Sequence, residues 1–269
     1  IDFFGKPDPW AQGLADMSME DFFTNDLETL FEDLNEEPEV ARELAAALGR
    51  VLLNLGDEER AITLLTRARD AVADSATTDP IGQADICFDL GVAARRAGQL
   101  LAAETALRMS LALRQEAFGE QHEEVASAWN TLGLVHHTMG ELEQAETEYL
   151  RALDLREVLH GAYGKELAST LNNLGALALA TQRDEDSIAF FERARDIQTR
   201  LYQYQEHPDL ATTLNNLGMA YQTIGRLDEA EELFQESLAM RRRILPADHP
   251  HLAGSLNNLG LIEEQRGRL

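Results

Sequence analysis

Apolar and small residues recur along most of the chain in paired stripes with helical spacing. One stripe follows the order i, i+3, i+4, i+7 and consists of Trp129, Leu132, Gly133 and His136. The next stripe consists of Leu142, Ala145, Tyr149, Ala152 and Leu153. Each stripe indicates one face of an amphipathic helix. Gly140 lies between them, where a helix C-terminus needs a residue that tolerates positive φ. The pattern therefore predicts two antiparallel helices joined by a short turn.

The same helix pair recurs at a nearly constant interval. A Leu-Gly pair marks each copy, and its glycines are Gly49, Gly91, Gly133, Gly175, Gly218 and Gly260, spaced 42, 42, 42, 43 and 42 residues apart. A second glycine follows seven residues later in every copy except the fourth, which has Gln182. A small residue follows twelve residues after the first glycine of the first five copies. Marks that stay in register over several copies indicate a repeat architecture.

These marks predict an all-α chain without β-strands. We expect helix pairs near 40–75, 81–117, 123–160, 165–202 and 208–244, followed by a lone helix from about 250. Pro208 and Pro250 suit the first turn of a helix, where the missing N–H has no partner to lose. The one extra residue of the fourth copy falls just before Pro208 and lengthens a joint. Residues 38–269 would then form an array of five full repeats plus the first helix of a sixth.

The repeated marks resemble the tetratricopeptide repeat, with its pattern W/L-x-x-L-G-x-x-x…A-x-x-x-F/Y/L-x-x-A. The period of 42, together with LNNLG at Leu171–Gly175, Leu214–Gly218 and Leu256–Gly260 and with DHPHLA, resembles the kinesin-light-chain type of that repeat. The resemblance implies a right-handed α-solenoid of stacked antiparallel helix pairs that binds peptides in its concave groove. Six positions depart from the pattern: Ala45, Cys87, Ala94, Ala178, Gln182 and Glu263.

Residues 1–37 have a different character. They form an acidic segment in which Phe22, Leu27, Leu30, Phe31 and Leu34 suggest one amphipathic helix. PDPW, the spacing to NEEPEV, and LGRVLLNLG resemble the segment that joins the kinase domain to the repeats in bacterial serine/threonine kinases with C-terminal tetratricopeptide arrays. This resemblance implies an alternative function, the sensor or docking arm of a multidomain signalling enzyme whose catalytic domain is absent from the chain.

Charge narrows the range of partners. The chain carries 48 acidic and 23 basic residues, a formal net charge of −25. Such a surface repels nucleic acid and anionic lipid, so we expect neither as a partner. The excess of acidic residues indicates either an ordinary solvated surface or a protein adapted to high salt concentration. No stretch is long and apolar enough to span a membrane. We expect a cytoplasmic protein, or an extracytoplasmic or membrane-tethered one if an anchor lies upstream.

Histidine, cysteine and other residue types that catalyse reactions or bind metals do not form a known catalytic or metal-binding pattern in this sequence. His136 and His137 are adjacent and point about 100° apart on a helix, so they cannot chelate one ion well. His122, His207 and His249 fall in the joints between repeats. Cys87 falls at a core position, where it is expected to be a small buried hydrophobe. No nucleophile has a patterned base beside it, so we expect no enzyme activity, no metal and no cofactor.

The first helices of stacked pairs line the concave wall of a solenoid. Among the wall positions of the second to fifth copies, only Asp85 is acidic, while the second helices carry many acids. We expect the peptide-binding groove to consist of Phe88, Arg95, Arg96, Asn130, Leu134, His137, Asn172, Leu179, Asn215, Met219 and Asn257. Basic and apolar residues on this wall indicate a protein or peptide ligand with acidic and apolar side chains.

The paired asparagines have two possible roles. Asparagine is less favourable than alanine in a helix interior by several tenths of a kcal/mol, so its repetition needs a reason. The first asparagine of each pair could offer a donor and an acceptor to an extended peptide. The second, at Asn173, Asn216 and Asn258, could instead bond to the neighbouring repeat and hold the superhelical pitch. Both roles remain open for both positions.

The leading interpretation is a non-enzymatic scaffold for protein–protein interaction. A third alternative is structural self-assembly through the ends of the array. The chain stops at RGRL, where the second helix of the sixth copy should start. We therefore expect the last helix to expose Leu256, Leu259 and Ile262 and to self-associate through this truncated end.

Overall fold

The structure is a computed structural model that describes residues 31, 34, 37–73, 79–161 and 163–267. Helices supply all the regular secondary structure of these residues, and no β-strand occurs among them. The helices are α4 (Pro38–Leu55), α5 (Glu58–Ala73), α6 (Pro80–Arg96), α7 (Leu100–Phe118), α8 (Glu123–Met139), α9 (Leu142–His160), α10 (Lys165–Ala180), α11 (Asp184–Leu201), α12 (Pro208–Thr223), α13 (Leu227–Ile244) and α14 (Pro250–Gln265). These bounds confirm the all-α class and the predicted helix pairs.

Most of the N-terminal segment lies outside the described residues. Phe22, Leu27 and Leu30, on which the predicted amphipathic helix rests, are among the residues not described, as is PDPW. Phe31 is described and is buried in a core cluster with residues of α4, α5 and α6. The guanidinium carbon of Arg67 lies 4.0 Å from the centre of the Phe31 ring. The start of the repeat array is therefore covered by an aromatic residue from the preceding segment.

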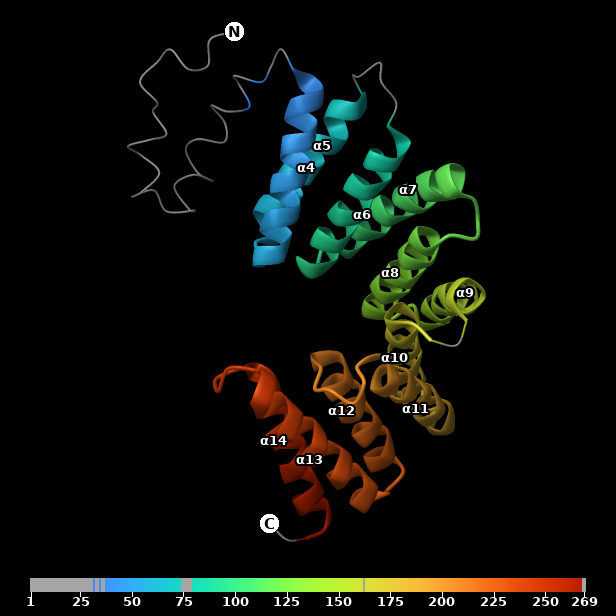
Figure 1. Cartoon of the computed structure of the whole chain (residues 1–269), viewed down its shortest axis with the longest axis vertical. Coiled ribbons are helices and arrows are strands. Elements are labelled where there is room, and N and C mark those ends of the chain that lie inside the picture. Colours follow the sequence, from blue (N-terminus) through green and yellow to red (C-terminus); the bar gives the residue numbers. More distant parts are fainter. Residues whose placement is uncertain (1–30, 32–33, 35–36, 74–78, 162, 268–269) are drawn as a thin grey trace, which may run out of the picture.

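The helix pairs stack side by side into a curved solenoid (Figure 1). Each even-numbered helix packs most extensively against the odd-numbered helix that follows it, from α4 with α5 to α12 with α13. Consecutive even-numbered helices also contact one another, as α8 and α10 do. The even-numbered helices line the inner side of the curve and the odd-numbered helices form its outer side (Figure 1). This arrangement places the predicted wall residues on the inner side.

The glycine of each Leu-Gly pair allows two helices to approach closely. A Cβ atom on Gly133 would lie 2.7 Å from Cδ1 of Tyr149, and one on Gly175 would lie 2.7 Å from Cε1 of Phe191. Real Cβ atoms do not approach other atoms this closely, so the ring fills the space that the glycine leaves. The small residue of the second helix, such as Ala145, is also fully buried. The repeated marks of the sequence are thus the contact points within each pair.

The turn inside each pair uses a left-handed residue. Gly140 and Gly225 have φ of 83° and 78°, which a residue without a Cβ adopts readily. In the fourth copy Gln182 takes the same place with φ of 59°. The fourth copy therefore keeps the left-handed turn between its two helices although it has Gln182 in place of the glycine.

Histidine side chains cap the N-termini of helices at three of the joints between repeats. His122 and His207 precede α8 and α12, and their Nδ1 atoms accept hydrogen bonds from the backbone N–H groups of Glu124 and Asp209, each at 3.2 Å. His249 accepts in the same way at the start of α14. The Tyr202 ring stacks on His207 with ring centres 3.7 Å apart. These histidines are therefore structural parts of the joints.

The face of α14 beyond the last pair is open. Leu256 and Leu261 are 49% and 41% exposed, and a Cβ atom added to Gly260 would meet nothing within 4 Å. The prediction that Ile262 is exposed is wrong. Ile262 is fully buried in a cluster with residues of α11, α12 and α13, and Leu259, also predicted to be exposed, is half-buried against the same cluster.

Candidate functional site

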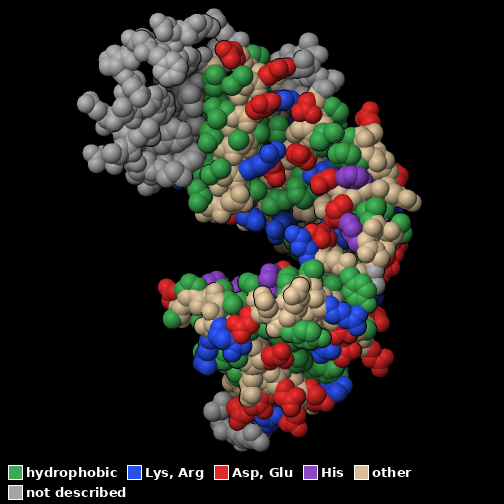
Figure 2. Space-filling model, in the orientation of Figure 1, with side chains coloured by type: hydrophobic (Ala, Val, Ile, Leu, Met, Phe, Trp, Pro, Cys, Tyr) green, Lys and Arg blue, Asp and Glu red, His purple; other side chains and the backbone are tan. Residues whose placement is uncertain are grey.

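The predicted groove residues all lie on even-numbered helices. Phe88, Arg95 and Arg96 come from α6; Asn130, Leu134 and His137 from α8; Asn172 and Leu179 from α10; Asn215 and Met219 from α12; Asn257 from α14. Each of them keeps part of its surface exposed. In the space-filling view the molecule is hollowed on its inner side, and basic side chains gather along the upper edge of the hollow (Figure 2). We call this inner surface, made by the even-numbered helices, the concave wall.

The asparagines of the concave wall bond across the repeats. Asn173 donates from Nδ2 to Oδ1 of Asn130 at 3.0 Å, and Asn258 donates to Oδ1 of Asn215 at the same distance. In these two cases the second asparagine of one repeat binds the first asparagine of the repeat before it. These bonds support the inter-repeat role for the second position. They also engage one atom of the first position, the Oδ1 of Asn130 or Asn215, so that a ligand would have to share it.

The side chain of Asn172 has different hydrogen-bond partners from those of Asn130 and Asn215. Its Nδ2 donates to Oγ1 of Thr213 at 2.8 Å and to the carbonyl of Ala168 at 3.1 Å. A carbonyl only accepts, so this contact fixes which end of the amide is which. Oδ1 of Asn172 is then left buried without a hydrogen-bond partner. Asn172 therefore has an unused acceptor, which lies beneath the surface of the wall, but no bond to a ligand is shown.

Buried side chains at the end of the second helices hold the joints together, and they were not among the residues predicted from the sequence. Arg156, only 4% exposed, donates from Nη1 to the carbonyl of Glu166 and to Oγ1 of Thr170, and from Nε and Nη2 to Glu123. Arg241 repeats the pattern with Ser255, and Gln198 accepts from Thr213. The signal was available: Arg114, Arg156, Gln198 and Arg241 follow the same intervals as the glycines.

The two arginines at the end of α6 have unequal surroundings. Arg96 donates from Nη1 to the carbonyl of Leu53 at 3.0 Å and thereby caps the C-terminal turn of α4. Arg95 is half-buried, and its Nε is buried without a partner. Burial, and then the neighbouring charge of Arg96, lowers the pKa of Arg95. Arg96 therefore has a partly structural role, whereas Arg95 forms no hydrogen bond or ion pair with the described residues.

The acidic residues of α6 are already neutralised. Asp85 accepts from Nη2 of Arg114 at 3.1 Å, and Asp89 accepts from Nε of Arg50 at 2.5 Å. The Arg114 guanidinium also stacks on the Phe88 ring at 4.2 Å. The wall around α6 consequently presents the charge of Arg95 without a competing carboxylate.

Other reactive side chains are committed to packing. His136 is fully buried, and its Nδ1 lies 2.6 Å from Oε2 of Glu148. Cys87 is buried, and burial raises the pKa of its thiol, which keeps it protonated and unreactive. No group of three or more histidines, cysteines or acidic residues in the described part of the chain is placed to hold a metal ion.

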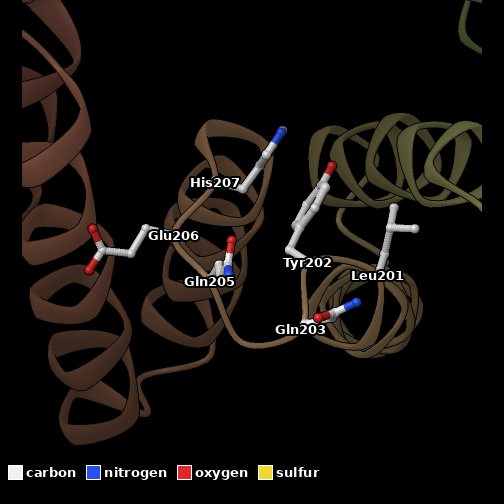
Figure 3. Close-up of a pocket in the computed structure, with 6 residues that line it drawn as sticks. All are labelled: Leu201, Tyr202, Gln203, Gln205, Glu206 and His207. Carbon is white, nitrogen blue, oxygen red and sulfur yellow. The ribbon is translucent and has the colours of Figure 1, made fainter.

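A pocket of about 310 Å³ lies at the joint between α11 and α12. It is lined by Leu201, Tyr202, Gln203, Gln205, Glu206 and His207, which are shown in Figure 3. The extra residue of the fourth copy falls here, and Gln203 and Tyr204 adopt positive φ of 51° and 64°. Glu206 points away from the pocket toward α13 (Figure 3), where it pairs with Arg243. The pocket is a consequence of the longer joint.

A family model for the tetratricopeptide repeat matches residues 81–157, 124–200, 166–243 and 209–269. The chain belongs to the tetratricopeptide repeat family. A comparison with curated proteins found no match. None of the described helices has the length and apolar character that crossing a membrane requires.

Solved structures of several repeat proteins share the fold. BtubC (BKLC) from P. vanneervenii is 24% identical, with a TM-score of 0.70, over 87% of this chain and 96% of that one. A putative kinesin light chain from Podosopora anserina with nearly identical repeats is 18% identical, with a TM-score of 0.63, over 79% and 100%. Aspartyl phosphate phosphatase F from Bacillus subtilis is 16% identical, with a TM-score of 0.68, over 94% and 63%. At these identities the likeness concerns the fold, which is that of kinesin-light-chain-like repeats.

Proposed function

We propose that this tetratricopeptide array is a non-enzymatic scaffold that binds an extended peptide along the concave wall. The fold is typical of protein–protein interaction scaffolds, and the wall supplies the kinds of contact that a peptide needs. The observation that carries the proposal is the set of buried polar atoms without partners. Arg95 Nε and Asn172 Oδ1 both belong to wall residues, and buried polar groups are otherwise almost always paired.

The spacing of the wall suits an extended chain. Neighbouring helix pairs stack roughly 10 Å apart, and an extended peptide advances about 3.3 Å per residue. One wall position per repeat therefore meets about every third peptide residue. Nδ2 of Asn130, which has no hydrogen bond within the described residues, would donate to a peptide carbonyl. Oδ1 of Asn172 would accept one peptide N–H once the side chains that cover it move aside.

Apolar side chains alternate with these amides. Leu134 and Leu179 are half-buried, and Met219 is 40% exposed. They offer surface to apolar ligand side chains, while Arg95 and Arg96 attract acidic ones. A wall of this kind inside a chain with a net charge of −25 favours an acidic, partly apolar peptide over a basic one that would bind the outer surface.

The test starts with a random peptide display library selected on the purified chain, followed by calorimetric titration of the selected peptides. Met219→Asp places a charge on the wall and should weaken binding by about tenfold, which corresponds to about 1.4 kcal/mol. Met109→Asp is the matched control, because Met109 is 46% exposed on the outer helix α7. Selected ligands that are basic, or that bind both variants equally well, would show that the concave wall is not the binding surface.

A further inference from the structure

A second pocket, of about 430 Å³, lies between the outer helices α7 and α9. Its lining includes Arg108 of α7, Trp129 of α8 and Arg151 of α9. We call this pocket the outer groove. None of the residues that line it belongs to the groove predicted on the concave wall. The outer groove is therefore a surface separate from the one to which the proposed function refers.

The outer groove contains a tryptophan where the next two repeats have leucine. Leu171 and Leu214 occupy the equivalent positions and are at most 2% exposed, whereas Trp129 is half-buried and lines the pocket. The guanidinium carbon of Arg151 lies 4.6 Å from the centre of the Trp129 ring. A guanidinium that stacks on an aromatic ring keeps its N–H donors in its own plane, directed past the ring. Arg151 is thus positioned by Trp129 while its donors stay available.

Arg151 has no acidic partner among the described residues, and comparison with the next repeat shows why. Forty-two residues later, Arg193 on α11 pairs with Glu157 on α9 at 2.6 Å. The residue of α7 that corresponds to Glu157 is Gln115, which is neutral and donates to Oε2 of Glu120 at 2.9 Å. An amide therefore occupies the position from which a carboxylate would reach Arg151.

The groove between α9 and α11 has a second ion pair that the outer groove also lacks. Arg183, at the start of α11, pairs with Glu146 of α9 at 2.6 Å. The corresponding residues of the outer groove are Glu141 and Glu104, which are both acidic. In the part of the chain that the structure describes, no hydrogen bond or ion pair joins a side chain of α7 directly to one of α9. The outer groove is therefore open where the next groove is bridged twice.

The carboxylates of the outer groove do not neutralise Arg151. Glu148 is 3% exposed, and its Oε2 lies 2.6 Å from Nδ1 of His136. Glu143 is exposed on α9, eight residues before Arg151. Eight residues of helix span about 12 Å, which is beyond hydrogen-bond reach. The pocket thus contains an arginine whose charge is not matched by a nearby acid.

We propose that the outer groove binds an acidic side chain, aspartate or glutamate, of a protein partner. The partner would supply to Arg151 the carboxylate that Glu157 supplies to Arg193 in the next groove. Two parallel N–H donors of a guanidinium match the two oxygens of a carboxylate. Arg108 lines the same pocket and is bound only through Nε, to Glu104 at 2.8 Å, so it adds attraction for the acid. The proposal does not depend on peptide binding at the concave wall.

The partner needs more than one acidic residue to bind well. Arg151 is exposed, and an exposed ion pair contributes little by itself. The pocket is larger than a carboxylate, and the half-buried indole of Trp129 offers apolar surface within it. A partner segment that carries an apolar or aromatic residue beside its acid would use both features. The structure thus favours an acidic segment with a neighbouring apolar side chain.

The first experiment needs no partner, because Gln115→Glu places the missing carboxylate on α7. In NMR spectra of the arginine Nε–H groups, the Arg151 signal should move in this variant and stay in place in Gln115→Met. Ala117→Glu is the matched control, since Ala117 is exposed on the same helix about 200° away from Gln115. It adds the same charge and should leave the Arg151 signal unmoved. No movement in Gln115→Glu would overturn the correspondence between the two grooves.

The second experiment searches for the partner chemistry. A peptide display library with a fixed central glutamate and random flanking residues is selected on the purified chain and depleted on the Arg151→Gln variant. Surviving peptides are titrated in the Trp10→Phe background, where Trp129 is the remaining tryptophan and reports by its fluorescence. Gln115→Glu should weaken binding about fivefold, because the groove then holds a carboxylate of its own. Replacing the central glutamate by glutamine should weaken it to the same extent, and Ala117→Glu should not weaken it.

Three results would contradict the proposal. If no peptide survives depletion on Arg151→Gln, the outer groove does not bind acidic peptides. If the surviving peptides bind Gln115→Glu as tightly as the wild type, or tolerate glutamine at the centre, their carboxylate is held elsewhere. If inorganic phosphate changes the Trp129 fluorescence at lower concentrations than the peptides do, at constant ionic strength, the carboxylate assignment is wrong.

One further variant separates the two surfaces. Met219→Asp alters the concave wall and should leave the affinity of these peptides unchanged. Loss of their affinity in Met219→Asp would assign them to the concave wall and overturn the outer groove as their site. Peptides that bind the outer groove while no ligand depends on Met219 would leave the outer groove standing and remove the proposed function of the wall.

Discussion

Gly175 and Gly260 occupy the same place in the repeat but have different surroundings. Around Gly175 the Phe191 ring would lie 2.7 Å from an added Cβ atom, whereas around Gly260 nothing lies within 4 Å. Glycine in a helix interior is less favourable than alanine by about 1 kcal/mol. The close approach of α11 offsets this cost at Gly175, and no such contact offsets it at Gly260.

Alanine at these two sites should therefore act in opposite directions. Gly175→Ala should destabilise the fold by about 1–3 kcal/mol through overpacking, since the Phe191 ring must move. Gly260→Ala should stabilise it by up to about 1 kcal/mol through helix propensity. Urea unfolding followed by circular dichroism measures both. Changes of the same sign would show that the Leu-Gly glycine is not kept for close packing.

The side chains of the concave wall show what the sequence can and cannot predict. The period of 42 placed Asn130, Asn172 and Met219 on one wall, because a repeat fixes which face each position occupies. The partner of each amide could not be predicted. Whether Oδ1 of Asn130 meets a ligand or Asn173 depends on rotamers that the repeat pattern does not encode. The unpaired hydroxyl of Tyr149 was missed because tyrosine, phenylalanine and leucine are equivalent in a hydrophobic pattern.

At the scale of helices, the joints are held by buried arginines as well as by apolar contacts. Arg156 on α9 links Glu123 on α8 to Thr170 on α10, and Thr170 in turn donates to Oδ1 of Asn130 at 3.1 Å. One hydrogen-bond network thus fixes the relative positions of three helices. The helices themselves could be predicted from their amphipathic stripes, but this network joins residues with no stripe in common.

Removing this arginine should loosen the middle of the array. Arg156→Met keeps much of the side-chain volume but leaves Glu123 and Thr170 without their partner, so we expect a loss of about 3 kcal/mol. Arg193→Met is the control: Arg193 pairs with Glu157 at 2.6 Å, but both side chains are more than a third exposed, and such pairs contribute about 0–1 kcal/mol. Hydrogen exchange should show the largest loss of protection in α8 and α10. Equal losses of stability in the two variants would contradict a special role for the joint.

At the scale of the whole molecule, the two ends of the described array differ. Phe31 covers the core at the α4 end, whereas α14 packs only against α13 and α12 among the described helices and exposes Leu256 and Leu261. In the other five copies the equivalent glycine is covered by a leucine or aromatic side chain of the following helix. Self-association through the uncovered surface of α14 would therefore bury these exposed apolar side chains.

We expect this chain to self-associate through α14 at high concentration, and more so as salt rises, because a net charge of −25 keeps separate copies apart at low ionic strength. Leu256→Glu combined with Leu261→Glu should abolish the association, since each copy would then bring two further charges to the contact. Leu101→Glu is the matched control, because Leu101 is 74% exposed on α7, far along the array from α14. Sedimentation velocity at several protein and salt concentrations measures the effect. Association that survives in the double variant, or that only Leu101→Glu removes, would place the contact on another surface.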